Sequence, residues 1–328
     1  MIERGGEVEL IAGPCSITNE NTNQILSMAQ ITVKNLKGKS QLALWGTRVV
    51  GLKSRTGFNS EGIGMGIDFG AVMQNIMILS QGNRNQELIV PPSVEVAKTI
   101  AQQTGLAICT EIVAPYAQVS VLEREMKNRK MLLWNPAVEQ LGWSLIPIAV
   151  AAQRNNWDVG IKNGKWLGCH LADAHNPESN EQTDLEKTWT GLASYVQNTG
   201  VPLENIAFIH RGVTVPDREN FRNAPVHEVA RRTKRTTRGA KLYFDPSHSF
   251  GPNMRDHILQ GTINALLMTD GNDWLYNGAL IEAGDSPTDT NQHITLGELE
   301  SLAREISRYR NLVTPKQSTN VFCYNAQT

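Results

Sequence analysis

Short apolar runs alternate with longer amphipathic stretches along most of the chain, most regularly after residue 105. Runs rich in β-branched, aliphatic and aromatic residues predict strands, and apolar positions at helical spacing predict helices. The predicted strands cover residues 8–12, 41–50, 106–111, 131–134, 157–162, 206–210, 242–245 and 278–282. The predicted helices cover residues 20–36, 69–80, 93–103, 115–126, 143–153, 184–197, 226–234, 254–268 and 295–308. The pattern therefore indicates eight successive strand–helix units.

Eight such units favour one α/β architecture. Strands separated by helices form right-handed crossovers and a parallel sheet. With eight units, a closed (β/α)8 TIM barrel is favoured over an open doubly wound sheet. The first strand ends in Gly13-Pro14, and no G-x-G-x-x-G fingerprint follows it. Its absence weakens the dinucleotide-binding alternative.

We expect residues 1–312 to form one catalytic barrel and residues 313–328 to form a polar C-terminal tail. The stretches 69–92 and 169–183 predict insertions in loops that follow strands. A Thr-x-x-Glu spacing at 295–298 predicts a capping box at the start of the last helix.

Composition narrows the class of protein. The chain has 328 residues, and Lys+Arg 31 against Asp+Glu 32 gives a net charge of −1. Near-neutral charge does not favour binding to nucleic acid or to an anionic membrane. No apolar run is long enough to span a bilayer and no signal peptide is evident. The four cysteines are scattered, with no C-x-x-C pair, so we expect a cytoplasmic protein in a reducing compartment.

Basic residues follow several of the predicted strands. In a TIM barrel the reacting groups lie at the carboxyl ends of the strands. The basic residues at these ends are Arg48, Lys53, Arg55, Lys162 and Arg211. Their convergence would suit a substrate that carries phosphate and carboxylate groups.

A second set of strand-end residues has metal-ligand chemistry. It consists of Cys15, His248, Glu282 and Asp289. A thiolate, an imidazole and two carboxylates can bind a divalent transition metal. In the alternative interpretation, Cys15 is a core residue, His248 is structural, and Glu282 pairs with a basic residue and binds no metal. We interpret Cys169, His170 and His175 as parts of a polar insertion.

The motifs that contain these residues resemble a known family. They are Gly-Pro-Cys-Ser at 13–16, Lys-Ser-Arg-Thr at 53–56, His-Arg-Gly at 210–212 and Asp-Pro-Ser-His at 245–248. Together and in this order they resemble type I 3-deoxy-7-phosphoheptulonate (DAHP) synthase, in the superfamily that includes 3-deoxy-octulosonate 8-phosphate synthase. Phe-Arg-Asn-Ala-Pro at 221–225 is similar to the branch whose members can be fused to chorismate mutase. The resemblance extends over about residues 10–302.

The resemblance implies a TIM barrel and a transferase reaction. Phosphoenolpyruvate would condense with erythrose 4-phosphate, with release of phosphate, as the first step of the shikimate pathway of aromatic amino-acid biosynthesis. Cys15, His248, Glu282 and Asp289 would hold a divalent metal, with Mn²⁺ first and Fe²⁺, Co²⁺ or Zn²⁺ as alternatives. The resemblance also implies a homo-oligomer, either a dimer or a tetramer.

The resemblance also implies roles for the basic residues. Arg48, Lys53, Lys162 and Arg211 would hold the phosphate and carboxylate of phosphoenolpyruvate. Arg55, followed by Thr56, would bind the phosphate of the aldose. Lys53, Lys162 and His248 would be the catalytic side chains.

The sequence departs from the family pattern at several positions. Ser54 replaces the usual proline, and residues 133–138 lack the arginine that usually follows the fourth strand. The usual histidine shortly after the metal-binding Glu282 is absent, and the spacing from Glu282 to Asp289 is short. We prefer Asp289 to Asp285 because the family's Asp-x-x-Gln pattern begins there.

These departures keep two alternatives open. One is a phosphoenolpyruvate-dependent synthase that acts on another aldose, as in the octulosonate or sialic acid synthases. The other is a degenerate, non-catalytic barrel that acts as a binding or regulatory partner.

Overall fold

A computed structural model describes residues 5–53, 66–82, 86–136, 142–164, 168–179, 181–286 and 288–315. Within these residues, parallel strands form a closed eight-stranded barrel. In chain order the barrel strands are β1 (Glu7–Gly13), β4 (Gly46–Arg48), β5 (Ala107–Glu111), β6 (Met131–Trp134), β7 (Asp158–Ile161), β8 (Ile206–His210), β9 (Lys241–Phe244) and β12 (Gly278–Glu282). The expected TIM barrel is therefore confirmed.

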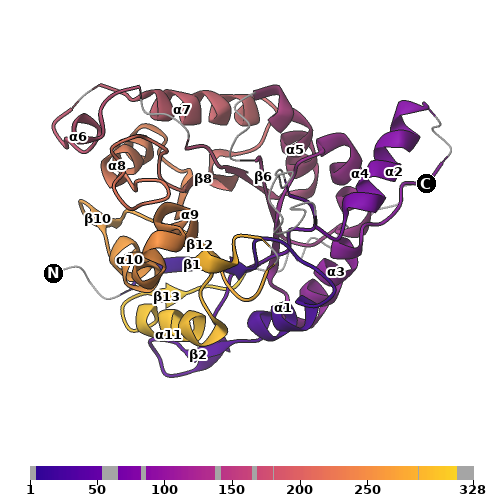
Figure 1. Cartoon of the computed structure of the whole chain (residues 1–328), viewed down its shortest axis with the longest axis horizontal. Coiled ribbons are helices and arrows are strands. Elements are labelled where there is room, and N and C mark those ends of the chain that lie inside the picture. Colours follow the sequence, from indigo (N-terminus) through magenta and orange to yellow (C-terminus); the bar gives the residue numbers. More distant parts are fainter. Residues whose placement is uncertain are drawn as a thin grey trace, which may run out of the picture.

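The first and last barrel strands close the sheet. β1 pairs in parallel with β12, with Ile11 opposite Leu280, and it also pairs with β4 on its other edge. Figure 1 shows these strands in the middle of the molecule, with helices arranged around them. The carboxyl ends of all eight strands therefore lie at one end of the barrel.

Helices follow the barrel strands, and most of them cover the outside of the barrel (Figure 1). They are α1 (Thr22–Ala29), α2 (Phe69–Ser80), α3 (Pro92–Thr104), α4 (Pro115–Glu125), α5 (Gly142–Asn155), α6 (Leu171–Ala174), α7 (Asp184–Gln197), α8 (His227–Thr236), α9 (Pro246–Phe250), α10 (Ile258–Leu266) and α11 (Leu296–Ile306). The 3-10 helices are η1 (Leu203–Asn205), η2 (Pro252–His257) and η3 (Thr290–Gln292). The capping box expected at Thr295 and Glu298 is present at the start of α11. No described helix has the length and apolar character needed to cross a membrane.

Short strands lie outside the barrel. β2 (Thr32–Lys34) and β3 (Ser40–Leu42) form one antiparallel pair, and β10 (Thr269–Asp270) and β11 (Asp273–Trp274) form another. β13 (Asn311–Leu312) pairs with the start of β1.

The β2–β3 hairpin corrects two of the sequence predictions. The helix expected over 20–36 ends at Ala29, because the β-branched residues that follow enter β2 instead. The strand expected over 41–50 is divided between β3, in the hairpin, and β4, in the barrel. The helix expected over 254–268 likewise divides into η2 and α10. In each case one predicted element divides into two, and hydrophobic periodicity alone does not locate the break.

The barrel interior has an apolar middle and a charged amino-terminal end. Side chains such as Leu132, Trp134 and Leu280 fill the middle and are fully buried. At the amino-terminal end, Lys241 Nζ lies 3.0 Å from a Glu9 oxygen and 3.3 Å from an Asp158 oxygen. These residues come from β9, β1 and β7, which are not neighbours in the sheet. The contact therefore crosses the interior of the barrel.

The two stretches predicted as insertions both contain helices. α2 lies between β4 and α3, and α6 lies between β7 and α7. α2 extends beyond the ring of helices in Figure 1, at the upper right. The polar tail expected over 313–328 lies largely outside the described residues, which end at residue 315.

Candidate active site

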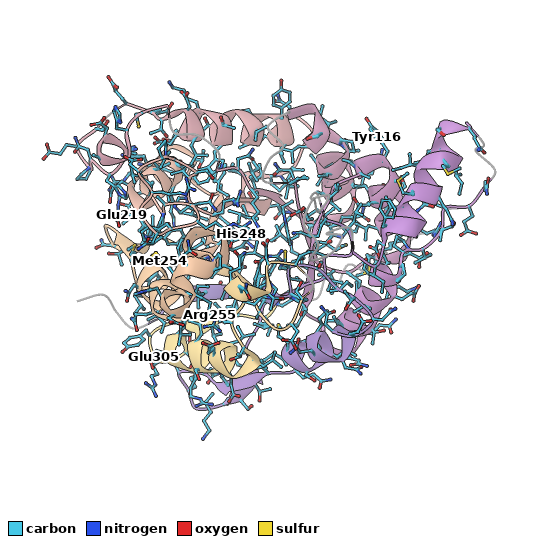
Figure 2. All side chains as sticks on the ribbon, in the orientation of Figure 1. Tyr116, Glu219, His248, Met254, Arg255 and Glu305 are labelled. Atoms are coloured by element: carbon cyan, nitrogen blue, oxygen red, sulfur yellow. The ribbon has the colours of Figure 1, made fainter. Side chains whose placement is uncertain are left out.

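The four residues predicted to bind a metal meet at the carboxyl end of the barrel. Cys15 follows β1, Glu282 ends β12, and His248 lies on α9 directly after β9. Figure 2 labels His248, on the ribbon of α9 toward the middle of the molecule. Asp289 comes from the loop after β12, and its Oδ2 lies 3.6 Å from the Cys15 sulfur. Ligand atoms of His248, Glu282 and Asp289 lie within 4.8 Å of one another.

Glu282 is the centre of this cluster. Its side chain is fully buried, and its Oε1 lies 2.9 Å from Nη2 of Arg48. Gln292 donates a hydrogen bond to Oε2. Burial opposes ionisation, but neighbouring positive charge, including that of Arg48, holds the pKa of Glu282 well below its usual value. Glu282 is therefore a carboxylate at neutral pH, and it does pair with a basic residue, as one sequence interpretation expected.

The orientation of His248 is set by Asp245. Asp245 is the N-cap of α9, and it accepts hydrogen bonds from the His248 backbone N–H and from Nδ1, the latter at 3.0 Å. Because Nδ1 donates to a carboxylate, the neutral imidazole has a bare lone pair on Nε2. That nitrogen lies 3.6 Å from Glu282 Oε1. Burial lowers the pKa of His248 well below its usual value, which favours this neutral form.

A fifth side chain, which the sequence analysis missed, joins the cluster. His293 is buried, and its Nε2 lies 3.6 Å from Glu282 Oε2. Cys15, Glu282 and His293 offer ligand atoms that all lie within 4.8 Å of one another. The sequence shows only that His293 directly follows Gln292 of the Asp-x-x-Gln pattern, 11 residues after Glu282.

The donor set fits a divalent cation. Two imidazole nitrogens without a proton face the two oxygens of one carboxylate, and all of these atoms are lone-pair donors that suit a divalent transition metal. His293 Nε2 is buried and has no hydrogen-bond partner. Burial and the charge of Glu282 raise the pKa of Cys15 to about 11. A bound cation would reverse that effect, since it favours the thiolate.

Arg222 supports the loop that carries Asp289. Its Nη1 lies 3.3 Å from Asp289 Oδ1, and it donates a hydrogen bond to the side-chain oxygen of Gln292. Asp289 itself has a left-handed backbone conformation, with φ 55°, which aspartate adopts more readily than most residues. In the sequence, the 221–225 motif indicates only a resemblance to one branch of the family.

The predicted cationic residues surround the same end of the barrel. Lys162 Nζ lies 2.8 Å from Asp245 Oδ2, and Lys53 Nζ lies 3.7 Å from Glu111 Oε2. Burial lowers the pKa of Lys162, and the nearby Asp245 opposes this shift only in part. Arg211 is also buried, and its charge reaches both Lys162 and His248. Arg55 and Thr56 lie outside the described residues.

Trp134 lies where the sequence lacks an expected arginine. It ends β6 and is fully buried. The Arg48 guanidinium carbon lies 5.7 Å from its ring centroid, and the Lys162 ammonium lies 5.8 Å from it. The aromatic face therefore stabilises two of the cations. The next residue, Asn135, accepts a hydrogen bond from the Lys162 backbone N–H at 3.0 Å.

The remaining candidates lie apart from this cluster. Asp285, the less favoured ligand, accepts hydrogen bonds from Gln24 and Asn21 near the rim. Cys169 is exposed. Neither it nor His170 or His175 belongs to a close group of metal-ligand side chains within the described part of the chain.

The chain was compared with known proteins. No protein-family model matches it, and no curated protein matches its sequence. Its structure is similar to the crystal structure of phospho-2-dehydro-3-deoxyheptonate aldolase (DAHP synthase) from Thermotoga maritima, with a TM-score of 0.59 and 15% identity over 92% of this chain and 69% of that one. A truncated 3-deoxy-D-arabino-heptulosonate 7-phosphate synthase from the same organism gives a TM-score of 0.57 and 15% identity, over 92% and 86% of the two chains. The expected resemblance is therefore confirmed in the fold.

Proposed function

We propose that this protein is a metal-dependent transferase that condenses phosphoenolpyruvate with erythrose 4-phosphate to form 3-deoxy-D-arabino-heptulosonate 7-phosphate and phosphate. One observation carries the proposal. Two groups of metal-ligand side chains that share Glu282 lie at the carboxyl end of one TIM barrel, beside the buried Arg48 and Lys162. Together the two groups include Cys15, His248 and Asp289. The barrel is similar in fold to two DAHP synthases.

The buried cations would bind and orient phosphoenolpyruvate. Lys162 and Arg211 lie near each other, and each can donate hydrogen bonds to a phosphate or carboxylate oxygen. Lys53 lies farther round the barrel, against Glu111. Because all three are at least nine-tenths buried, their charges act in a low dielectric and are strong there.

Cys15, His248, Glu282 and Asp289 would hold the metal. When bound, a divalent ion supplies Lewis-acid polarisation of the aldehyde carbonyl. Mn²⁺ is the first ion to test, with Fe²⁺, Co²⁺ and Zn²⁺ as alternatives.

The reaction needs one carbon–carbon bond and one carbon–oxygen cleavage. Carbon 3 of phosphoenolpyruvate attacks the aldehyde carbon, water adds at carbon 2, and phosphate leaves by C–O cleavage. Fixed cations such as Lys53 and Lys162 stabilise the negative charge that develops on oxygen. Lys162, whose pKa is lowered by burial, is also suited to give a proton to that oxygen.

Phosphate release tests this proposal. The purified protein is incubated with phosphoenolpyruvate, erythrose 4-phosphate and Mn²⁺, with and without a chelator. We expect release that needs the aldose and is abolished by the chelator and by Cys15→Ala. The exposed Cys169 provides the matched control, since Cys169→Ala keeps full activity. No release of phosphate with Mn²⁺, Fe²⁺, Co²⁺ or Zn²⁺ would reject the proposal.

A second candidate function is the same chemistry on a longer aldose. Trp134 and Asn135 at the end of β6, in place of the expected arginine, favour this alternative. A panel of longer aldoses in the phosphate assay separates the two functions. Release only with a longer sugar would assign the alternative.

The proposal includes self-association of the chain. α2 exposes Met73, Ile76 and Met77 on one face, with 41%, 40% and 56% of each residue accessible. No charged residue occurs between Phe69 and Gly82. An uncharged apolar face is complementary to the same face of a second copy, since no charge is buried there.

A further inference from the structure

His293 is held rigidly at the end of β12. Its side chain is 3% exposed. The next residue, Ile294, forms a parallel bridge with Ala283, and Ile294 N donates to the Glu282 carbonyl at 3.0 Å. Gly284 N donates back to the Ile294 carbonyl at 2.9 Å. This short ladder brings His293 against Glu282, although 10 residues separate them.

The hydrogen bonds of His293 determine its tautomer. Nδ1 lies 2.6 Å from the carbonyl oxygen of Gly284. A carbonyl oxygen only accepts, so Nδ1 carries the proton. In the neutral ring Nε2 then has a bare lone pair, and this atom faces Glu282 Oε2 at 3.6 Å. Two acceptors that face each other in a buried site have no hydrogen bond to share.

His248 shows the same pattern on the other side of Glu282. Its Nδ1 donates to Asp245, and its Nε2 faces Glu282 Oε1 at 3.6 Å. Histidines that bind metals usually donate the other ring N–H to a carboxylate or a backbone carbonyl. His248 has the first kind of partner and His293 has the second. In both imidazoles, therefore, Nδ1 donates a hydrogen bond to an oxygen and Nε2 faces one oxygen of Glu282.

We propose that His293 is a further metal ligand, so that the site holds its cation with two imidazoles and favours Zn²⁺, Co²⁺ or Fe²⁺ over Mn²⁺. Imidazole nitrogen suits these ions, whereas Mn²⁺ prefers oxygen ligands and binds most weakly of the four in the usual order. Cys15, within 4.8 Å of both Glu282 and His293, adds a sulfur ligand with the same preference. The inference rests on the cation site of the proposed function, and not on the identity of the aldose.

Metal affinity measured directly tests this inference. The full-length protein is freed of metal, and Zn²⁺ and Mn²⁺ are titrated in competition with a chromophoric chelator. His293→Asn keeps an amide N–H for the Gly284 carbonyl but lacks the Nε2 lone pair. We expect it to lose at least about tenfold in Zn²⁺ affinity, with a smaller loss for Mn²⁺, so that the preference for Zn²⁺ falls. His257→Asn, at an exposed histidine, is the matched control and keeps both affinities.

The outcomes separate this inference from the proposed function. If the wild type binds neither ion, both the metal-dependent function and the role of His293 are rejected. If the wild type binds metal and His293→Asn keeps the same affinities, only the role of His293 is rejected. X-ray absorption of the Zn²⁺-loaded wild type gives a second measurement that needs no variant. Two imidazole ligands are expected, and one would overturn the inference.

Discussion

Arg48 and Glu282 form an ion pair across the barrel, with Nη2 2.9 Å from Oε1 and neither side chain exposed. The two residues come from β4 and β12, and β1 lies between these strands in the sheet. The pair therefore joins the second and eighth barrel strands, and it includes Glu282, one of the proposed metal ligands. Arg48 keeps Glu282 ionised, and a bound cation would share the same carboxylate.

Removal of Arg48 should therefore destabilise the protein. Arg48→Met leaves the Glu282 carboxylate buried without its partner, and we expect the free energy of unfolding to fall by about 3–5 kcal/mol. A divalent cation should restore part of this loss, because it neutralises the same carboxylate. Urea unfolding with and without Zn²⁺ measures both effects.

A surface ion pair provides the control for that measurement. Arg304 and Glu300 are 58% and 46% exposed at the side chain, so Arg304→Met should change stability by less than about 1 kcal/mol. If Arg48→Met and Arg304→Met lowered the free energy of unfolding equally, the buried Arg48–Glu282 pair would not stabilise the protein more than a surface ion pair does.

Lys162 should determine the alkaline limit of activity. Burial lowers its pKa below that of a free lysine, so the side chain loses its proton at a lower pH than usual. If protonated Lys162 binds phosphoenolpyruvate, kcat/KM falls as pH rises through this lowered pKa. Lys162→Arg should move the fall to higher pH, because arginine stays charged.

Neutralisation of Lys162 measures its binding contribution. Lys162→Met should reduce kcat/KM by about tenfold to 100-fold, the equivalent of one charged hydrogen bond. Steady-state kinetics from pH 6 to 10 are to be compared with those of Lys130→Met, at the opposite end of the barrel. An alkaline limit that stays unchanged in Lys162→Arg would exclude Lys162 from this role.

Two buried histidines should make the protein sensitive to acid. Burial lowers the pKa of His210 to about 3 and that of His227 to about 4. In the unfolded chain both titrate near 6.5. Between these values the unfolded state binds more protons, so stability present above pH 6.5 is lost as the pH falls toward 3. The unfolding free energy should be clearly lower at pH 5 than at pH 7.5.

One substitution isolates the contribution of His227. Its Nδ1 lies 2.7 Å from the hydroxyl of Tyr276, and His227→Asn can keep this hydrogen bond without titrating. Urea unfolding with a chelator present should show a smaller loss at pH 5 in this variant than in the wild type. An identical loss in both proteins would mean that His227 does not carry the effect.

The charged network at the amino-terminal end of the barrel should affect stability and not catalysis. Lys241 contacts Glu9 and Asp158, and its ammonium lies 5.1 Å from the ring centroid of Trp45. Lys241→Met removes one partner from each of two carboxylates, of which Asp158 keeps Lys130 at 2.8 Å, and should cost about 1–3 kcal/mol of stability. At a temperature where the variant is folded, kcat should equal that of the wild type, since the reacting groups of TIM barrels lie at the other end. A large fall in kcat in a Lys241→Met protein of unchanged stability would show that the network affects catalysis, contrary to this prediction.

The apolar face of α2 should control self-association. Met77→Glu places a charge at the most exposed of the large apolar side chains of α2. We expect the mass in solution to fall to that of a monomer, as measured by sedimentation equilibrium. Gln74→Glu, one turn before on the same helix, tests the charge without loss of an apolar side chain. A monomeric wild type would reject the proposed association.

Local patterns in the sequence were sufficient for most of the barrel. β6, β8, β12, α2 and α7 have the bounds expected from the sequence, because each is one apolar run between clear turn residues. Prediction failed at residues 20–36 and 41–50, where a hairpin outside the barrel interrupts the alternation. Only pairing with a partner strand decides that residues 32–34 are extended.

In the candidate site, too, some features follow from the local sequence and others depend on the tertiary structure. Residues directly after a strand, such as Cys15, Lys162 and His248, are placed by the strand itself, so the sequence was enough to bring them to one end of the barrel. The closed barrel decides which of them touch. The Arg48–Glu282 pair depends on the register of β4, β1 and β12.

His293 and Arg222 depend on tertiary structure entirely. Each lies in a loop, and the path of a loop is determined by contacts with the rest of the protein and not by its own periodicity. The sequence by itself therefore determined the order of the eight barrel strands and of most of the helices between them, together with the residues at the strand ends, because these follow from local patterns of apolar and polar side chains. Only the tertiary structure decided that His293 faces Glu282, because that contact depends on a loop folding back along β12.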